Sequence, residues 1–150
     1  MNSSPLSRRA WDYVMKALNL GHRAVLMASR GHLGQSAFGM QAVELHTVGR
    51  RSGQRRTVLL TAPISKPGLV VLVASKGGDD RDPDWYRNLV ANPDVYLTIR
   101  GHEAPWHART ASPEEKQALW PAITAAYKGY ASYQARTARE IPVVICEPRA

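Results

Sequence analysis

Three short apolar runs rich in β-branched residues, each followed by a turn, constrain the fold of this chain more than any other feature. They occupy residues 41–48, 55–62 and 68–75. This composition, with turn residues between the runs, predicts β-strands. In the first run Val43 and Leu45 alternate with Glu44 and His46, which predicts one wet face. The third run is apolar at successive positions, so we expect a central strand buried on both faces.

Three further strands bring the expected number to about six, at residues 94–100, 104–111 and 142–146. In the first of these, apolar and polar residues alternate, as in a half-buried strand. Pro63 and Pro67 bracket a connection that we expect to be irregular, because proline cannot donate to a sheet ladder. The whole pattern indicates an α+β domain with a mostly antiparallel sheet, for which closure into a barrel is one solution.

Capping residues mark two helices inserted between the strands. The first is expected to have Asp82 as its N-cap and Pro83 at its first position, and to end before Asn92. The second begins with a capping box at Ser112, and Pro121 must kink or restart it.

Residues 1–32 form an N-terminal segment with an amphipathic helical pattern. Four apolar residues fall at i, i+3, i+4 and i+7 on one helical face: Trp11, Val14, Met15 and Leu18. Such a helix, with basic residues around it, can lie on a membrane surface. Alternatively its apolar face covers the core of its own domain, and the pattern leaves both interpretations open.

Composition narrows the class of protein. The 150 residues fit one domain, residues 1–150, and one cysteine excludes an intrachain disulfide. No apolar segment is long enough for a transmembrane helix and no signal-peptide pattern is present, so we expect a cytoplasmic protein. The net charge of +8 suggests an anionic partner, for which nucleic acid, anionic lipid and a polyanionic coenzyme all qualify. Nucleic acid is disfavoured because the arginines gather in a tight turn and not along a reading helix.

Two turns concentrate the chemistry. The segment 49–56 places four arginines around a Ser-Gly pair. The segment 75–78, Ser-Lys-Gly-Gly, directly follows an apolar strand, and its glycines let the backbone approach a ligand. Arginine forks, a lysine and exposed amides suit a multiply charged anion. We find no metal-ligand spacing, carboxylate pair or catalytic triad.

These two segments, together with Asp84-Trp85-Tyr86-Arg87-Asn88-Leu89-Val90-Ala91-Asn92-Pro93 and the terminal Ile141-Pro142-Val143-Val144, resemble the deazaflavin-dependent nitroreductase family. The resemblance extends from about Leu33 to Pro148. It implies a split β-barrel over residues 33–150 that binds coenzyme F-420, a 5-deazaflavin with a phosphodiester and an oligoglutamate tail.

The resemblance also implies which residues bind this coenzyme. The expected set is Arg50, Arg51, Arg56, Thr57, Val58, Ser75, Lys76, Gly77, Gly78 and Trp85. Arg55 replaces the proline that usually precedes the family's arginine. For Trp85 the alternative is a buried anchor of its own short helix.

The same resemblance points to residues that act on the substrate: Tyr133, Tyr130, Ser75 and Tyr127. A phenol can donate a hydrogen bond to a quinone or nitro oxygen. From spacing alone, the three tyrosines share an arc of about 120° on one helix, which equally suits packing. Lys128-Gly129 replaces a proline-containing link that is frequent in the family.

The expected function is hydride transfer from reduced F-420 to a small electron-poor acceptor, a quinone, an enone or a nitroaromatic compound. The expected assembly is a monomer or homodimer, with peripheral membrane contact through the N-terminal helix as an option. Two alternatives remain: a flavin mononucleotide enzyme of the same architecture, and a non-catalytic deazaflavin-binding protein. Nucleic-acid binding rests on charge alone and would weaken steeply with salt.

Overall fold

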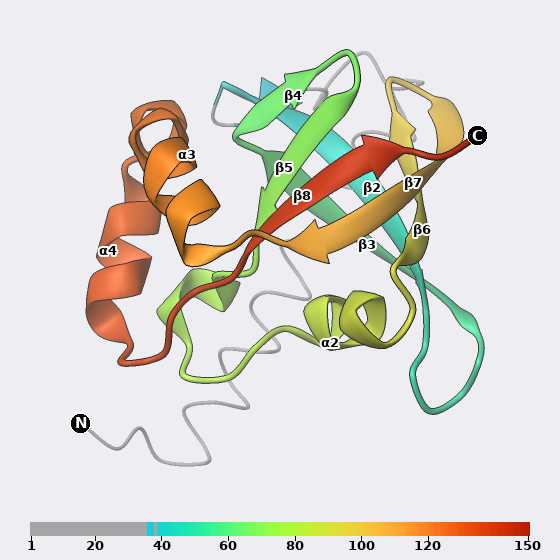
Figure 1. Cartoon of the computed structure of the whole chain (residues 1–150), viewed down its shortest axis with the longest axis horizontal. Helices are drawn as coiled ribbons and strands as arrows, with labels where there is room; N and C mark the ends of the chain where they lie inside the picture. The colour runs from blue at the N-terminus through green and yellow to red at the C-terminus, as the bar shows by residue number, and fades with distance from the viewer. Residues whose placement is uncertain (1–35, 38) are drawn as a thin grey trace.

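A computed structural model describes residues 36–37 and 39–150 (Figure 1). The strands are β1 (Ser36–Ala37), β2 (Met40–Val48), β3 (Arg55–Ala62), β4 (Ile64–Lys66), β5 (Leu69–Val73), β6 (Asp94–Ile99), β7 (His102–Thr110) and β8 (Val143–Pro148). The helices are α2 (Asp84–Ala91), α3 (Pro113–Ala126) and α4 (Gly129–Arg136), with a short 3-10 turn, η1 (Lys76–Gly78). The predicted N-terminal helical segment, residues 1–32, lies outside the described residues.

The described strands form one curled sheet in the order β1-β2-β6-β7-β8-β5-β4, with β3 paired to β2. Every recorded pairing is antiparallel. Leu45 on β2 stands opposite Val58 on β3 and Leu97 on β6, so β2 is hydrogen-bonded on both edges. The predicted α+β class with an antiparallel sheet is therefore confirmed.

The concave face of the sheet encloses the main core. Its buried residues come from six strands and α2: Val43, Leu45, Ala62, Val70, Leu72, Leu89, Val95, Leu97, Ala108, Val144 and Cys146. Burial raises the pKa of the Cys146 thiol to about 12, so this cysteine is an inert core residue. Because β5 and β8 contribute alternate residues here, their other face needs a second cover.

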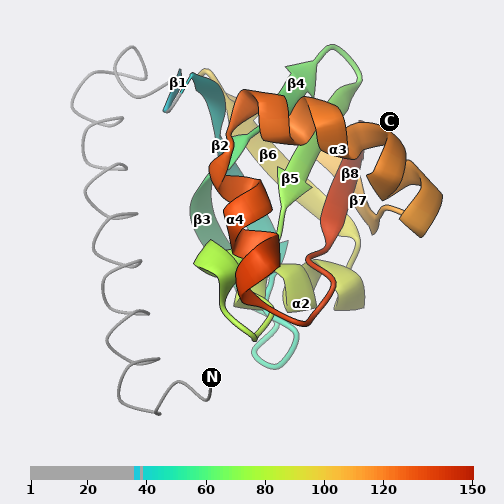
Figure 2. The ribbon, with the colours of Figure 1, turned by 90° about the vertical axis from the view of Figure 1, so that its left-hand side faces the viewer.

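Helices α3 and α4 supply that cover (Figure 2). A second cluster joins Val71, Val73 and Val143 of β5 and β8 to Ile123 of α3 and Tyr130 of α4. Strand β5 is thus apolar on both faces because it separates two cores, although it lies next to the edge strand β4 and not at the predicted central position. The predicted capping box starts α3: Ser112 Oγ accepts from the Glu115 N–H, and Glu115 accepts from the Ser112 N–H.

Helix α2 lies at one end of the curled sheet, at the bottom of Figure 1. Leu89 inserts into the main core, and Tyr86 Oη lies 2.8 Å from Thr110 Oγ1 of β7. Asn88 is buried and donates to Thr47 Oγ1 of β2 at 3.3 Å. One short helix is therefore fixed to both β2 and β7.

Three local predictions about backbone or exposure are wrong. Residues 64–66 form β4, because the prolines flank this edge strand and leave its three residues free to pair with β5. His46 is only 6% exposed, because its ring nitrogens lie 2.8 Å from the hydroxyls of Thr57 and Thr98. Asp82 does not cap α2; Pro83 holds the N-cap position, and the Asp82 carboxylate accepts from Arg139.

Two helix predictions also need correction or refinement. Helix α3 is continuous through Pro121 and does not restart there. Next to the proline, Thr124 Oγ1 donates to the carbonyl of Trp120. The three tyrosines do not share one helix. Tyr127 is the C-cap residue of α3, whereas Tyr130 and Tyr133 belong to α4.

Candidate functional site

The loop between β5 and α2, residues 74–83 and called here the β5–α2 loop, has an unusual backbone. Lys76, Gly77 and Gly78 have successive φ values of 46°, 64° and 85°. A lysine in the left-handed region is uncommon and indicates a conformation imposed by the surroundings. Ser75 is right-handed and Lys76 left-handed, an alternation that turns successive N–H groups towards one side, as in anion-binding nests.

Gly78 brings this loop against α4. A Cβ atom at this position would lie 3.0 Å from the Tyr133 carbonyl oxygen and 3.1 Å from Tyr133 Cα. Only glycine tolerates both that approach and the left-handed φ. The Gly78 N–H donates to the Ser75 carbonyl at 2.9 Å, so it is engaged within the loop.

The tyrosine cluster, Tyr127, Tyr130 and Tyr133, is compact despite its origin in two helices. The ring of Tyr127 lies 5.3 Å from that of Tyr130 and 6.2 Å from that of Tyr133, between centroids. The hydroxyl oxygens of Tyr127 and Tyr133 are 3.3 Å apart. Gly129 makes this possible, because a Cβ atom there would overlap the Tyr127 ring at 2.4 Å.

Two of these phenols have a pKa above that of an ordinary tyrosine. Burial raises the pKa of Tyr133 from 10.0 to about 12, with a further contribution from Tyr127. Burial also raises the pKa of Tyr130, whose hydroxyl donates to Met40 Sδ at 3.7 Å. Near neutral pH both therefore retain a proton that can be donated. Tyr133 is half-buried and Tyr130 is buried, so Tyr133 is the more accessible donor.

The basic turn, residues 49–56, is tied to α2 by one of its arginines. The Arg50 N–H and Nη1 both donate to Asn88 Oδ1, at 3.2 and 3.0 Å. Arg50 Nη2 also lies 3.4 Å from Asp84 Oδ1. These contacts make Arg50 an anchor of the turn.

The other arginines of the turn divide into two kinds. Arg55 forms an ion pair with Glu103 and lies over the Tyr96 ring, 5.7 Å from its centroid. Arg51 and Arg56 are exposed, and among the described residues neither makes a recorded ion pair. Two guanidinium groups thus remain available to an anion at the tip of the β2–β3 hairpin.

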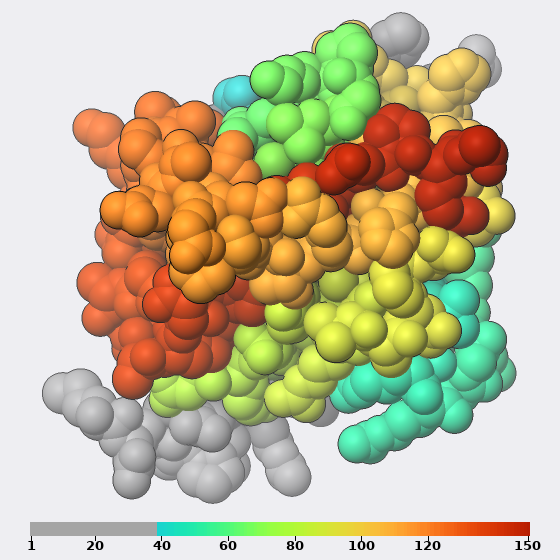
Figure 3. All heavy atoms as spheres, in the orientation of Figure 1, coloured from blue at the N-terminus to red at the C-terminus, as the bar shows by residue number. Residues whose placement is uncertain are grey.

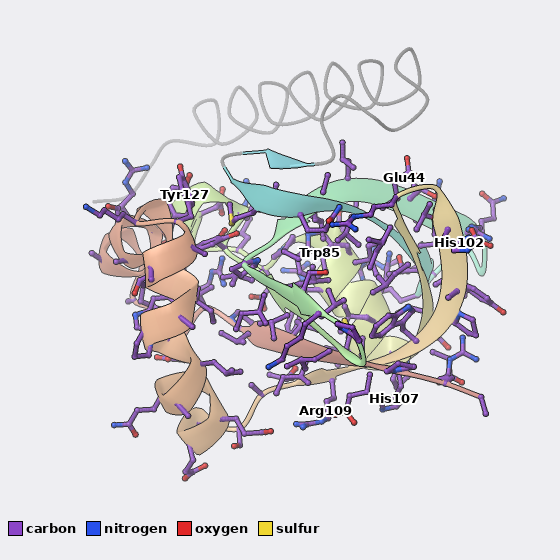
Figure 4. All side chains as sticks on the ribbon, turned by 90° about the horizontal axis from the view of Figure 1, so that it is seen from above. Glu44, Trp85, His102, His107, Arg109 and Tyr127 are labelled. Carbon is purple, nitrogen blue, oxygen red and sulfur yellow. The ribbon has the colours of Figure 1, made fainter. Side chains whose placement is uncertain are left out.

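The remaining predicted binding residues have structural partners. Thr57 Oγ1 is engaged by His46, and Val58 packs on the main core. Trp85 is half-buried and also packs on that core, where Figure 4 shows its side chain within the curled sheet. It meets Tyr86 edge-on with ring centroids 6.4 Å apart.

The predicted residues therefore form two groups. In the first, the β5–α2 loop and the tyrosine cluster are in direct contact through Gly78 and Tyr133. The second is the basic turn with α2 beside it, and Figure 3 shows their atoms adjoining at the lower right. Within the described residues, no three of His, Cys, Asp and Glu gather as a metal site requires.

Comparison with known families distinguishes a deazaflavin enzyme from a flavin mononucleotide enzyme. Residues 20–148 match the family described as F-420H(2)-dependent quinone reductase. The chain belongs to this family. The predicted membership of the deazaflavin-dependent reductases is thereby confirmed, and the flavin mononucleotide enzymes become the weaker alternative.

Curated members of the quinone reductase family include close relatives of the chain. An F-420H(2)-dependent quinone reductase of Mycobacterium tuberculosis is 36% identical over 133 residues, which cover 85% of this chain and 88% of the relative. A putative F-420H(2)-dependent quinone reductase of the same species is 44% identical over 80 residues, 53% of this chain and 67% of the relative.

Two solved structures at 33% and 40% identity share the fold. An F-420-H2-dependent reductase (FDR-A) superposes with a TM-score of 0.64 at 40% identity, covering 71% of this chain and 93% of that protein. A protein described as a domain-swapped dimer gives a TM-score of 0.66 at 33% identity, covering 96% and 100% respectively.

Two residues central to this site were missed by the sequence analysis. Asn88 lay within the family-like segment but carried no assigned role, although a buried amide beside Arg50 holds the basic turn. Arg139 had no motif around it, yet it donates to three carbonyls of the β5–α2 loop, those of Ala74, Ser75 and Asp79. Only the folded chain reveals these roles.

Proposed function

We propose that this protein transfers a hydride from reduced coenzyme F-420 to an electron-poor acceptor, with a quinone as the favoured class. One observation carries the proposal: the left-handed loop at Lys76–Gly78 is in backbone contact with the helix that holds Tyr133. A site for an anionic coenzyme and a pair of protonated phenols thus lie side by side. Family membership supplies the identity of the coenzyme.

The charges of the chain fit this coenzyme. Its phosphodiester and glutamate tail are anionic, and Arg51, Arg56 and Lys76 would bind them by charge-assisted hydrogen bonds. Arg50 would act through the turn that it anchors on Asn88. Gly77 and Gly78 give the backbone its shape, while Thr57, Val58 and Trp85 would line the approach to the ring.

The bound deazaflavin supplies the hydride, and the chain supplies the proton donor and the position of the acceptor. Tyr133 would donate to the acceptor oxygen, since its pKa of about 12 keeps the phenol protonated. Tyr130 and Tyr127 would pack against a flat acceptor and orient Tyr133. Ser75, which is 8% exposed, would lie beside the reacting atoms of the coenzyme and the acceptor.

Several finer features belong to the same proposal. The sheet would be a split β-barrel and residues 1–150 a single domain, with FDR-A as the structural counterpart. A homodimer is the assembly that we favour, because a protein that matches 96% of this chain over its own whole length is described as a domain-swapped dimer.

None of the described helices has the length and apolar character to span a membrane. A cytoplasmic protein that touches the membrane through residues 1–32 would meet lipid-soluble quinones.

Titration of the purified protein with F-420 and, separately, with flavin mononucleotide tests the proposal. Tryptophan fluorescence at physiological salt would report binding. We expect micromolar or tighter binding of F-420 and much weaker binding of the flavin. Equal or reversed preference would favour a flavin enzyme, and binding of F-420 without turnover of any quinone would favour a non-catalytic binding protein.

Replacing Arg56 with alanine is expected to weaken F-420 binding at least tenfold, about 1.4 kcal/mol. The reason is the loss of an exposed guanidinium that has no recorded ion pair among the described residues. Lys66→Ala is the matched control, since it removes an exposed positive charge from β4. Equal affinities of the two variants would exclude Arg56 from the anion site.

Replacing Tyr133 with phenylalanine is expected to lower kcat for a quinone about 100-fold or more, because a positioned proton donor contributes about 10²–10⁴-fold. The ring contacts with Tyr127 and Tyr130 are retained, so F-420 affinity should change less than twofold. Tyr96→Phe, on an exposed tyrosine of β6, is the control. Full turnover by Tyr133→Phe with bound coenzyme would rule out the phenol as donor.

A further inference from the structure

The guanidinium of Arg139 has an unusual set of acceptors. Nη2 donates to the carbonyls of Ala74 at 3.2 Å and Ser75 at 2.9 Å, and Nε donates to the Asp79 carbonyl at 2.8 Å. Nη1 donates to Asp82 Oδ1 at 3.0 Å. One side chain therefore holds four acceptors spread along a single loop. Its planar fork allows this, whereas a lysine cannot reach as many acceptors in fixed directions.

These acceptors enclose the left-handed segment. Ala74 and Ser75 precede Lys76, and Asp79 and Asp82 follow Gly78. A peptide's carbonyl and N–H point in opposite directions, so fixing the Ala74 and Ser75 carbonyls also fixes the N–H groups of Ser75 and Lys76. The direction of the candidate anion nest is thus set by Arg139.

The same arginine belongs to the segment that continues α4. Gln134 Nε2 on α4 donates to the Arg139 carbonyl at 2.8 Å. Thr137 Oγ1 donates to Asp80 Oδ1 of the loop at 2.9 Å. With the contact between Gly78 and Tyr133, these bonds join the β5–α2 loop and the tyrosine helix into one body.

Charge and burial suit this role. The Arg139 side chain is 15% exposed, and burial lowers its pKa while the carboxylates of Asp82, Asp79 and Asp80 oppose that effect. All of its recorded partners are backbone carbonyls or Asp82, so the loop engages four of the five guanidinium N–H groups. We therefore expect Arg139 to act on a ligand mainly through the loop that it holds.

We propose that Arg139 is a positioning residue: it holds the β5–α2 loop in its binding conformation and in register with Tyr133, so that coenzyme and acceptor meet. This inference rests on the proposed function. It adds a residue that is distant from the loop in sequence and contacts neither reactant.

The test compares Arg139→Gln with Arg149→Gln. Arg149 is a control of the same kind, because it too donates to backbone carbonyls, those of Trp106 and Val95, but at the β6–β7 hairpin. Arg139→Gln loses four recorded hydrogen bonds and Arg149→Gln loses two, so both variants should have a lower Tm, with the larger fall in Arg139→Gln. Only Arg139→Gln should raise the Kd for F-420 at least tenfold and lower kcat for the quinone menadione when F-420 is saturating.

Hydrogen exchange of the free protein gives a second, coenzyme-independent measurement. Amides of residues 75–82 should exchange at least tenfold faster in Arg139→Gln than in Arg149→Gln. Arg139→Lys retains the positive charge near Asp82 and serves as a second variant in case Arg139→Gln does not fold. Its Tm should stay close to that of the unmodified protein, while its amides still exchange faster and its F-420 binding is weaker.

The outcomes separate two kinds of failure. If the unmodified protein binds F-420 and Arg139→Gln binds it equally well with unchanged loop exchange, the positioning role is wrong and the proposed function stands. If the unmodified protein does not bind F-420, the proposed function falls and the positioning role with it. An equal loss of affinity in both arginine variants would show a general stability effect and contradict the inference.

Discussion

Replacing Gly78 with alanine is expected to weaken F-420 binding at least tenfold and to lower the stability of the protein. Two costs combine at this position. A left-handed alanine costs about 1–2 kcal/mol, which is about 2–8 °C in Tm for a chain of this size. The added methyl also meets the Tyr133 carbonyl at 3.0 Å and the Arg136 Cβ at 3.2 Å, so the loop must move away from α4.

Gly68→Ala separates these two costs. Gly68 has a φ of 81°, close to the 85° of Gly78, but a Cβ atom there would meet nothing within 4 Å. It should therefore lose a similar amount of backbone stability and bind F-420 as the unmodified protein does. Thermal unfolding and fluorescence titration of both variants provide the measurement. If Gly78→Ala and Gly68→Ala have the same Tm and the same affinity for F-420, the contact between the β5–α2 loop and α4 has no role in binding.

The strands were predictable because their signals are local. Turn residues and β-branched runs placed β2, β3 and β5 within one or two residues of their observed bounds. The strand between Pro63 and Pro67 was missed because its three residues have no pattern of their own. It exists through pairing with β5, which the sequence does not display.

Burial on the outer face of the sheet could not be read from alternation. The pattern of Glu44 and His46 predicted water on that side, but the imidazole of His46 lies between two threonines from neighbouring strands. A histidine can satisfy both ring nitrogens within the protein, and its burial then depends on partners 11 and 52 residues away. The alternation of apolar and polar residues along one strand does not predict such contacts.

The candidate site shows the same division between local and distant information. The Ser-Lys-Gly-Gly segment contributed to a family resemblance, and the family match confirms that family. Arg139 carried none, because its four acceptors lie 57 to 65 residues earlier in the chain. Sequence motifs identify residues expected to meet ligands. The residues that hold those motifs in place emerge only from tertiary contacts.

Replacing Asn88 with alanine is expected to cost about 2–4 kcal/mol, the sum of three lost hydrogen bonds in a buried setting. The amide accepts from the Arg50 N–H and Nη1 and donates to Thr47 Oγ1. Without it, the Arg50 guanidinium keeps the 3.4 Å contact with exposed Asp84, the one other polar contact recorded for it among the described residues. The fall in Tm should be about 4–16 °C.

Asn92→Ala is the matched control for this change. Asn92 is exposed at the C-terminal end of the same helix, and its backbone N–H bond to the Asn88 carbonyl survives the substitution. Its effect should stay within about 0.5 kcal/mol. The basic turn contributes Arg51 and Arg56 to the proposed anion site, so Asn88→Ala should also weaken F-420 binding while Asn92→Ala leaves it unchanged. A destabilised Asn88→Ala protein with full F-420 affinity would show that the coenzyme does not depend on how α2 holds the turn, and would move the anion site to Lys76 and its loop.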